Sequence, residues 1–397
     1  MLRIDAPTAR RAGKAHGRRT LLLFVSALAV LACALPGLAR ADAVRSVSVD
    51  DNSPPPGTPT YVALNGYFPG TITVHAGEAV QWTFKHWHMV IFTPGSQNPP
   101  DLAQFDPLHP YSGYNDAAGV PFWFNASPAL EVPTGTHGRV GGAVGTSQQH
   151  CAGAPSSAPN VEDGTQFRNS GFPTDGTSPP APYTLCFPTV GTYKYYCIIH
   201  RGHTDHGMFG VVNVVPTTTT IPTAKQNDAQ AAAERSAAYA NATQLDNYNP
   251  GANTVSEGHD GSVASLLKFF PSDLSVGIGT TVTFSISSQN EVHVAAFGPE
   301  AYRDANESKF VQLQSGEVEL NPMIFLPSDP PPVLPPYTGL NHGNGWENTG
   351  ATTSETPDPN KPTTLAGASH QITFTTGGDY VYECLIHPGM EATIHVH

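Results

Sequence analysis

The sequence predicts an all-β protein of two tandem β-sandwich domains, with long loops and one linker helix. Gly and Pro each occur 38 times in 397 residues, and only 13% of the residues are charged. This composition is typical of strands joined by turns and long loops rather than of a helical protein. A second observation is that several segments with alternating apolar and polar residues occur twice. A third is that a single segment of the mature chain, residues 224–245, has a strong helical composition.

Three sequence blocks occur in the same order in both halves of the chain. The first block alternates apolar and polar residues on either side of a glycine, which predicts two strands joined by a tight turn. The second block begins with a histidine, and the third contains Tyr-x-Cys-x-x-His. Such internal repetition indicates a tandem duplication of one β-domain. The paired blocks are 68–80 with 270–282, 88–92 with 293–297, and 191–200 with 378–387.

The repeats define the predicted domain boundaries. The first sandwich domain is expected over residues 42–218, a linker with a helix over 219–255, and the second sandwich domain over 256–397. The helix, residues 224–245, is rich in Ala and Gln and contains no Gly or Pro, which favours helix formation. Because its apolar residues are mostly small alanines, we expect it to lie on the surface. Long loops are expected between the second and third block of each half.

The first 41 residues have the pattern of a secretory signal peptide. A leader with several Arg residues precedes a short apolar run at residues 21–35, and Ala39 and Ala41 supply the small residues of a cleavage site. The alternative is a membrane anchor, but the run is shorter than the ~20 residues that span a bilayer. We therefore predict an exported protein, periplasmic, at the cell surface or secreted, whose mature chain does not insert into a membrane.

The charge balance excludes one class of partner. The chain carries 19 Lys and Arg against 32 Asp and Glu, a formal net charge of −13. Binding to nucleic acid depends on clustered cations that contact phosphates. We therefore expect no nucleic-acid partner.

The cysteines separate into two kinds. Of the five, Cys33 lies in the predicted signal peptide, and Cys151 and Cys186 lie in a loop-rich part of the first domain. Export would place the protein where disulfides form, so we predict a Cys151–Cys186 disulfide, although spacing alone does not fix the connectivity. Cys197 and Cys384 occur in near-identical contexts, which leaves them for other chemistry.

Each half offers a histidine, then a cysteine, a second histidine and a methionine. A thiolate, two imidazoles and a thioether are the ligands of a type 1 copper site, in which the methionine is a weak axial ligand. Zinc is the alternative metal, because Cys and His also suit it. The methionine and the predicted export favour copper. The predicted ligands are His88, Cys197, His200 and Met208 in the first half, and His293, Cys384, His387 and Met390 in the second.

These motifs resemble those of the cupredoxin family, the blue copper proteins that include plastocyanin and amicyanin. The resemblance rests on the His-x-Val-x-Phe of residues 88–92, the looser match at 293–297, the two Tyr-x-Cys-x-x-His segments and the methionine after each. The short Cys384–Met390 loop is similar to that of amicyanin. The resemblance implies Greek-key sandwiches, a type 1 copper in each half bound by the eight residues above, and one-electron transfer.

The first half has additional histidines whose role stays open. His86 precedes His88, and His203 and His206 lie in an insertion between His200 and Met208. They could form a further metal site, one of the two insertion histidines could replace Met208, or they could be solvated surface residues. Copper oxidases and nitrite reductases place a histidine beside the type 1 cysteine, whereas Cys197 is flanked by Tyr196 and Ile198.

The predicted function is electron transfer between redox partner proteins. Two alternatives remain: a protein that stores or delivers copper, and a copper oxidase or reductase that uses an extra histidine site in the first half. The sequence favours a carrier or a copper-binding protein over an enzyme.

Overall fold

A computed structural model describes thirteen segments of the chain, all within the unit Asp42–His397. The predicted signal peptide, residues 1–41, lies outside the described residues. So do most of the predicted long loops. The described segments are 44–51, 53–95, 97–100, 103–105, 124–126, 160–171, 182–200, 207–288, 290–307, 311–314, 317–325, 347–353 and 367–397.

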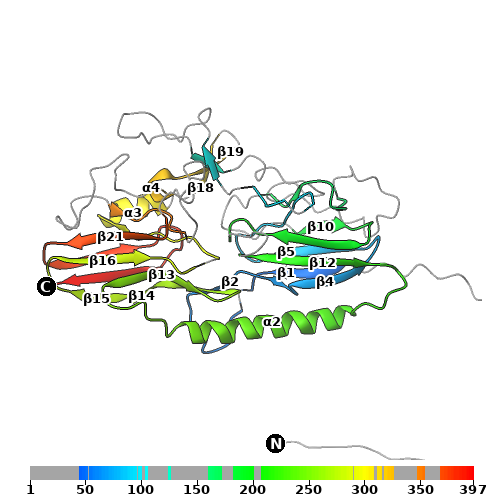
Figure 1. The fold of residues 1–397 in the computed structure, drawn as a ribbon, viewed down its shortest axis with the longest axis horizontal. Helices are drawn as coiled ribbons and strands as arrows, with labels where there is room; N and C mark the ends of the chain where they lie inside the picture. Colours follow the sequence, from blue (N-terminus) through cyan, green and yellow to red (C-terminus); the bar gives the residue numbers. More distant parts are fainter. Residues whose placement is uncertain are drawn as a thin grey trace, which may run out of the picture. The chain divides into compact units, whose positions relative to one another are not determined.

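The first half contains a four-stranded and a five-stranded sheet (Figure 1). The four-stranded sheet has the order β10-β5-β1-β3, and the five-stranded sheet has the order β4-β12-β11-β6-β9. The strands of the first sheet are β1 (Arg45–Val49), β3 (Tyr67–Phe68), β5 (Ala79–Phe84) and β10 (Tyr183–Cys186). Those of the second are β4 (Thr71–His75), β6 (Ile91–Phe92), β9 (Arg168–Asn169), β11 (Gly191–Tyr196) and β12 (Phe209–Val215).

The second half contains two five-stranded sheets, in the orders β2-β14-β13-β16-β21 and β15-β23-β22-β17-β20. The first of these is formed by β2 (Val62–Leu64), β13 (Thr254–Asp260), β14 (Ala264–Phe270), β16 (Thr280–Ser285) and β21 (Ser369–Phe374). The second is formed by β15 (Asp273–Val276), β17 (Ala296–Phe297), β20 (Glu347–Asn348), β22 (Gly378–Glu383) and β23 (Glu391–Val396). Strand β13 thus begins two residues before the predicted start of the second domain.

The two halves repeat one another strand for strand. In the first half β1 pairs in parallel with β5, and β4 pairs in parallel with β12. The equivalent strands of the second half, β13 with β16 and β15 with β23, are parallel as well. Every other pair in these four sheets is antiparallel in the described residues. The predicted all-β class with two sandwiches is confirmed, and the duplication seen in the sequence is present in the fold.

A glycine turn divides each repeated first block between the two sheets of its sandwich. Gly77 has a φ of +93° and Gly279 a φ of +86°, conformations that side chains with a Cβ rarely adopt. The predicted pair of strands is present on either side of each glycine. However, β4 and β5 belong to different sheets rather than forming a hairpin, as do β15 and β16.

Strands from the two halves also pair with one another. Strand β2 belongs by sequence to the first half, yet it pairs antiparallel with β14 of the second half. A further sheet, in the order β18-β19-β8-β7, joins two strands from each half. Its strands are β7 (Ala103–Phe105), β8 (Phe124–Ala126), β18 (Val311–Gln314) and β19 (Glu317–Leu320). The repeat pattern in the sequence did not indicate that strands of the two halves would pair in either of these sheets.

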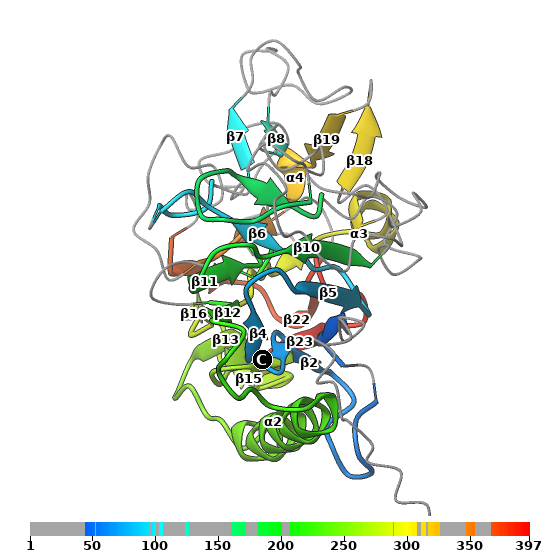
Figure 2. The same ribbon diagram turned by 90° about the vertical axis from the view of Figure 1, so that its right-hand side faces the viewer.

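Helix α2 (Ala224–Leu245) has the predicted bounds and lies on the surface (Figures 1 and 2). Thr223 caps it in a reciprocal capping box with Gln226. One face is exposed, while Ala231, Ala238 and Ala242 are buried against strands β2, β3 and β14. The helix lies on the surface as expected, and the structure adds that one face is packed, because small alanines let the helix approach the strands closely.

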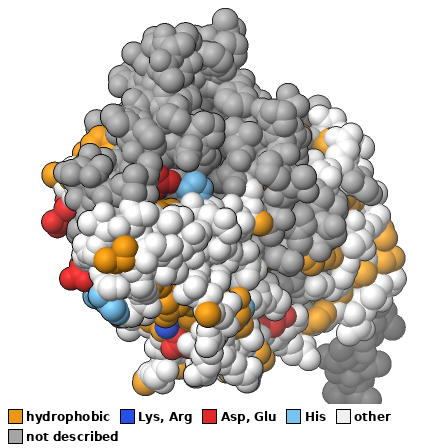
Figure 3. Space-filling model, turned by 60° about the vertical axis from the view of Figure 1, so that its left-hand side comes forward, with side chains coloured by type: hydrophobic (Ala, Val, Ile, Leu, Met, Phe, Trp, Pro, Cys, Tyr) orange, Lys and Arg blue, Asp and Glu red, His pale blue; other side chains and the backbone are white. Residues whose placement is uncertain are grey.

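Two shorter helices, α3 (Glu300–Glu307) and α4 (Pro322–Phe325), complete the described elements. None of the helices in the described part of the chain is long and apolar enough to cross a bilayer. On the face drawn in Figure 3, the described residues show single acidic and histidine side chains and no group of Lys and Arg.

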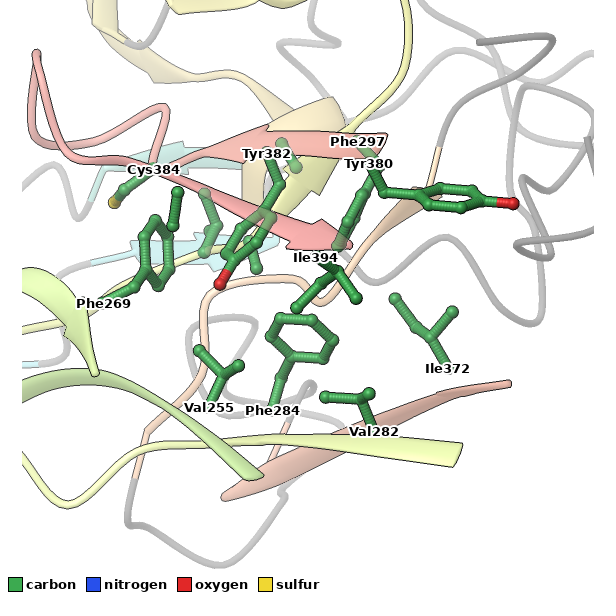
Figure 4. Packing of buried hydrophobic residues seen from close by; sticks show 14 of the residues in the cluster. Val255, Phe269, Val282, Phe284, Phe297, Ile372, Tyr380, Tyr382, Cys384 and Ile394 are labelled. Carbon is green, nitrogen blue, oxygen red and sulfur yellow. The ribbon is translucent and has the colours of Figure 1, made fainter. Parts of the chain in front are cut away.

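Each sandwich has an aromatic core that reaches the predicted ligands. In the second half, Phe284 and Tyr382 pack edge to face with ring centroids 5.4 Å apart, and Tyr382 also stacks on Phe297 (Figure 4). Cys384 belongs to the same buried cluster. In the first half Trp82 contacts Tyr195, and Cys197 belongs to that cluster. Both cysteines are therefore held by the rigid packing of a core.

Candidate metal centres

The first-half ligand set converges at one end of its sandwich. His88 lies between β5 and β6, Cys197 directly follows β11, and His200 lies in the turn after it. One donor atom from each residue lies within 4.8 Å of the other two. The Cys197 sulfur is 3.8 Å from Nδ1 of His88 and 3.5 Å from Nδ1 of His200. All three residues are buried.

The second-half set has the same arrangement. His293 precedes β17, Cys384 directly follows β22, and His387 lies three residues later. The Cys384 sulfur is 3.9 Å from Nδ1 of His293 and 3.6 Å from Nδ1 of His387. The two Nδ1 atoms are only 3.1 Å apart. In both halves the Nδ1 atoms face the sulfur, so the Nε2 atoms point away from it.

Both predicted methionines close the ligand loop in the same way. The amide of Cys197 donates to the carbonyl of Met208 at 3.0 Å, and the amide of Met208 donates to the carbonyl of His200 at 3.1 Å. In the second half, Cys384 donates to Met390 at 2.9 Å. Met390 in turn donates to His387 at 3.1 Å, and both methionines are buried. Although the first-half loop is longer, Met208 therefore makes the same backbone hydrogen bonds to the cysteine and histidine as Met390 does in the second half.

The candidate ligands differ in how tightly they hold a proton in the metal-free chain. Burial alone would raise the pKa of Cys197, but the adjacent His200 and His88 rings lower it to about 5. Burial would lower the pKa of His88, yet Asp50 and Cys197 raise it to about 10. Burial and the charge of His387 lower the pKa of His293 to about 3. Binding a metal cation requires deprotonated donors, so the cation would displace the extra proton of His88, whereas the low pKa of Cys197 already favours the thiolate.

The donors fit a soft or borderline cation. Two ring nitrogens and a sulfur converge in each half with no lysine or arginine among them, and a backbone amide, that of Met89, donates to the Cys197 sulfur at 3.2 Å. Cys197 and Cys384 are both free cysteines, as a thiolate ligand requires. Thiolate with imidazole favours copper or zinc over magnesium or calcium.

Asp50 supports the first-half site from behind His88. Its Oδ2 lies 3.3 Å from Nε2 of His88 and also contacts Nδ1 of His86. Asp50 is buried; burial would raise its pKa, but the hydrogen bonds to His86 and His88 lower it to about 2. A carboxylate on the outer nitrogen of a metal-binding histidine fixes the ring and makes it more basic.

The equivalent position in the second half lacks this contact. Strand pairing places Gly258, which has no side chain, where Asp50 lies in the first half; both residues have a positive φ, 74° and 65°. The preceding residue, Glu257, accepts a hydrogen bond from Thr352 at 2.7 Å. In the described residues, Nε2 of His293 has no hydrogen-bond partner and packs against the Cα of Gly258, where a Cβ would lie only 2.3 Å away. The two centres therefore differ in the electrostatic surroundings of their first histidine.

Glu291 lies between the two ligand sets. Its Oε1 is 3.7 Å from Nε2 of His200, and its Oε2 is 3.3 Å from Nε2 of His387. The side chain is only 4% exposed. Burial would raise the pKa of Glu291, but the charges of His200 and His387 hold it well below its usual range. One buried carboxylate thus contacts a predicted ligand from each half.

The remaining predicted residues have different outcomes. The side chain of His86 is 55% exposed and belongs to neither ligand group. Cys186 is buried and disulfide-bonded, but its predicted partner Cys151 lies outside the described residues, so the pairing stays a prediction. His203 and His206 also lie outside the described residues.

Sequence reasoning missed both supporting carboxylates. Asp50 is 38 positions from His88, and no spacing rule connects them. Glu291 offers a weak signal, since it precedes His293 by two residues just as His86 precedes His88. Its contact with His200 depends on how the two halves meet, which a repeat pattern does not contain.

Comparisons with known proteins find similar folds and no sequence relative. No family model and no curated protein matches the chain. A copper(I) form of an amicyanin mutant is 15% identical, with a TM-score of 0.17; the match covers 38% of this chain and 89% of that one. A mutant plastocyanin of fern is 16% identical, with a TM-score of 0.18, covering 36% and 99%.

A purple cupredoxin from Nitrosopumilus maritimus is also similar, at 14% identity and a TM-score of 0.17, covering 37% of this chain and 100% of that one. These identities and scores record a similarity to cupredoxin structures and no more. The strand order of the two sandwiches defines the fold, and the converging donors define the candidate sites.

Proposed function

We propose that this protein is an exported copper protein that transfers single electrons, with a type 1 copper site in each half. The observation that carries the proposal is the repeated donor set. In both halves a buried cysteine and two histidine Nδ1 atoms converge, and a buried methionine is hydrogen-bonded through its backbone to the same loop. A soft thiolate, two imidazoles and a thioether suit copper better than zinc.

Copper in such a site would supply one-electron chemistry by cycling between its +1 and +2 states. The protein would contribute cysteine and histidine donor atoms whose positions need not change when the copper gains or loses an electron. His88 and Cys197 are nearly inaccessible to solvent, and each cysteine belongs to its aromatic core. Donors fixed in a close-packed core change position little when the charge of the metal changes, which favours rapid transfer.

Redox partner proteins are the proposed donors and acceptors of these electrons. Export is supported by the basic leader, the apolar run and the small residues at Ala39 and Ala41. The acidic composition favours partners with basic surfaces, because charge complementarity accelerates encounter.

The test is metal analysis, a visible spectrum and a redox titration of the copper-loaded protein. We expect two coppers per chain, an intense thiolate-to-copper absorption band and reversible potentials. Tightly bound copper without reversible cycling would instead indicate storage or delivery. Colourless protein that prefers zinc would overturn the proposal, and consumption of dioxygen or nitrite during turnover would indicate an enzyme.

A further inference from the structure

Where the two halves meet, Nε2 of one predicted ligand from each half lies close to the same carboxylate, that of Glu291. In His200 and His387 the Nδ1 atom faces the cysteine, so Nε2 carries the remaining proton and points at Glu291. The two oxygens of Glu291 are divided between the rings, Oε1 toward His200 and Oε2 toward His387. A single side chain therefore links one ligand set to the other.

The position of Glu291 is fixed from both halves. Its amide donates to Ser288 Oγ at 2.7 Å, within the second half. From the first half, Asn65 Nδ2 donates to Oε1 of Glu291, and the same nitrogen contacts Ser265 Oγ at 2.9 Å. Asn65 is held there because β2 pairs with β14 and the Asn65 amide donates to the Val263 carbonyl at 2.8 Å.

This link is not a repeated property of the domain. The first-half counterpart of Glu291 is His86, whose side chain is more than half exposed and contacts Asp50 instead. The carboxylate that supports His88, Asp50, contacts no predicted ligand of the second half among the described residues. Glu291 is therefore a feature of the contact between the two halves and is not part of the structure that the two candidate sites have in common.

We propose that Glu291 is a positioning residue that couples the two metal centres electronically, so that electrons pass between the halves through His200, Glu291 and His387. The inference rests on the proposed function, since it requires copper in both halves. One electron leaves a Cu(I) in one half, leaving Cu(II), and reduces a Cu(II) in the other half to Cu(I). No bond forms or breaks, and the Nε2 protons stay on their rings.

The chemistry of the bridge supports this role. Carboxylates beside the outer nitrogen of ligand histidines orient the rings and raise their basicity, and mutation of such outer partners costs about 10- to 100-fold in metal affinity or activity. Here the buried carboxylate acts on two sites at once. Glu291 is buried, and the side chains of His200 and His387 are only 10% and 16% exposed, so the carboxylate and both rings are largely shielded from water.

The experiment measures the rate of electron transfer within the copper-loaded full chain. A Met390→Gln background changes the axial donor of the second half and so separates its absorption band from that of the first. A brief reducing pulse adds less than one electron per chain. Redistribution between the halves then appears as a phase whose rate does not depend on protein concentration.

Two substitutions of Glu291 remove different properties of the bridge. Glu291→Gln keeps the length but removes the negative charge that faces Nε2 of both His200 and His387. Glu291→Asp keeps the charge but is one methylene too short to span both rings. We expect each to slow the intramolecular phase by roughly 10- to 100-fold, while both copper absorption bands persist.

Glu162→Gln is the matched control. It also replaces a buried carboxyl group, but Glu162 contacts no predicted metal ligand among the described residues. We expect it to leave both copper absorption bands and the intramolecular rate close to those of the parent.

The outcomes separate the two proposals. If the parent binds two blue coppers and the Glu291 variants redistribute electrons as fast as it does, the bridge is refuted and the electron-transfer function stands. A Glu162→Gln rate as slow as that of the Glu291 variants would also refute the bridge, because any lost buried carboxyl group would then suffice. If the parent lacks two reversible coppers, both proposals fall.

Discussion

At the scale of single residues, a few buried polar or ionisable side chains are expected to determine metal binding and the pH dependence of stability. Cys384 is the clearest case, because it is the sole thiolate donor in its set and is 1% exposed. We expect Cys384→Ser to remove the second-half blue absorption and one of the two copper equivalents, while the first half stays coloured. Absorption spectra with metal analysis check this. Survival of the whole spectrum would show that the ligand assignment is wrong.

Glu162 gives a second residue-scale prediction, remote from either metal centre. Burial raises its pKa to about 7, and its Oε2 has no hydrogen-bond partner among the described residues. The folded state therefore holds the proton more tightly than the unfolded state. Stability should fall as the pH rises from about 4.5 to about 7 and remain reduced above it.

We expect Glu162→Gln to remove most of this pH dependence and to stabilise the fold at about pH 8 by on the order of 1–3 kcal/mol. The backbone amide of Gly164 can still donate to the glutamine oxygen. Urea denaturation at about pH 5 and about pH 8 measures the effect. Asp228→Asn, an exposed carboxyl on α2, is the control; an equal gain there would refute the explanation.

At the scale of elements, helix α2 shows what small residues contribute. Ala242 is fully buried against strands that carry Leu64 and Phe270, with no space for a larger side chain to be added without strain. We expect Ala242→Leu to destabilise the protein by about 1–3 kcal/mol in urea denaturation. Ala240→Leu, on the exposed face of the same helix, should leave stability nearly unchanged. Equal effects would mean that the helix does not pack as described.

The positions of strands and of the helix could be predicted from the sequence better than which of these elements pack or pair with one another. Alternation predicted the strands around Gly77 and Gly279, and composition predicted α2 to the residue. The convergence of Cys197 with His200 and of Cys384 with His387 followed from the short Cys-x-x-His spacing, because one turn brings those candidate ligands together. The pairing of β2 with β14 and the position of Glu291 could not be predicted, since both depend on contacts about 200 positions apart that leave no period in the sequence. The buried face of α2 was missed because alanine contributes little to an apolar pattern.

At the scale of the whole molecule, the two halves share structure that neither completes alone. Strand β2 of the first half extends a sheet of the second, and α2 contacts strands β3 and β14 from different halves. We expect the copper-loaded protein to unfold in a single calorimetric transition. Cys384→Ser should lower the midpoint of that single transition, because a metal bound to the folded state adds to its stability. Two separate transitions, one of them unaffected by the substitution, would contradict this.

The backbone hydrogen bonds that join Cys197 to Met208 and Cys384 to Met390 have an evolutionary consequence. They close both loops identically, although seven residues lie between histidine and methionine in one copy and two in the other. The stretch after His200 is therefore a place where length can drift without disturbing the donors. After a gene duplication, the two copies can therefore differ in the length of this stretch while both keep the same backbone closure between cysteine and methionine.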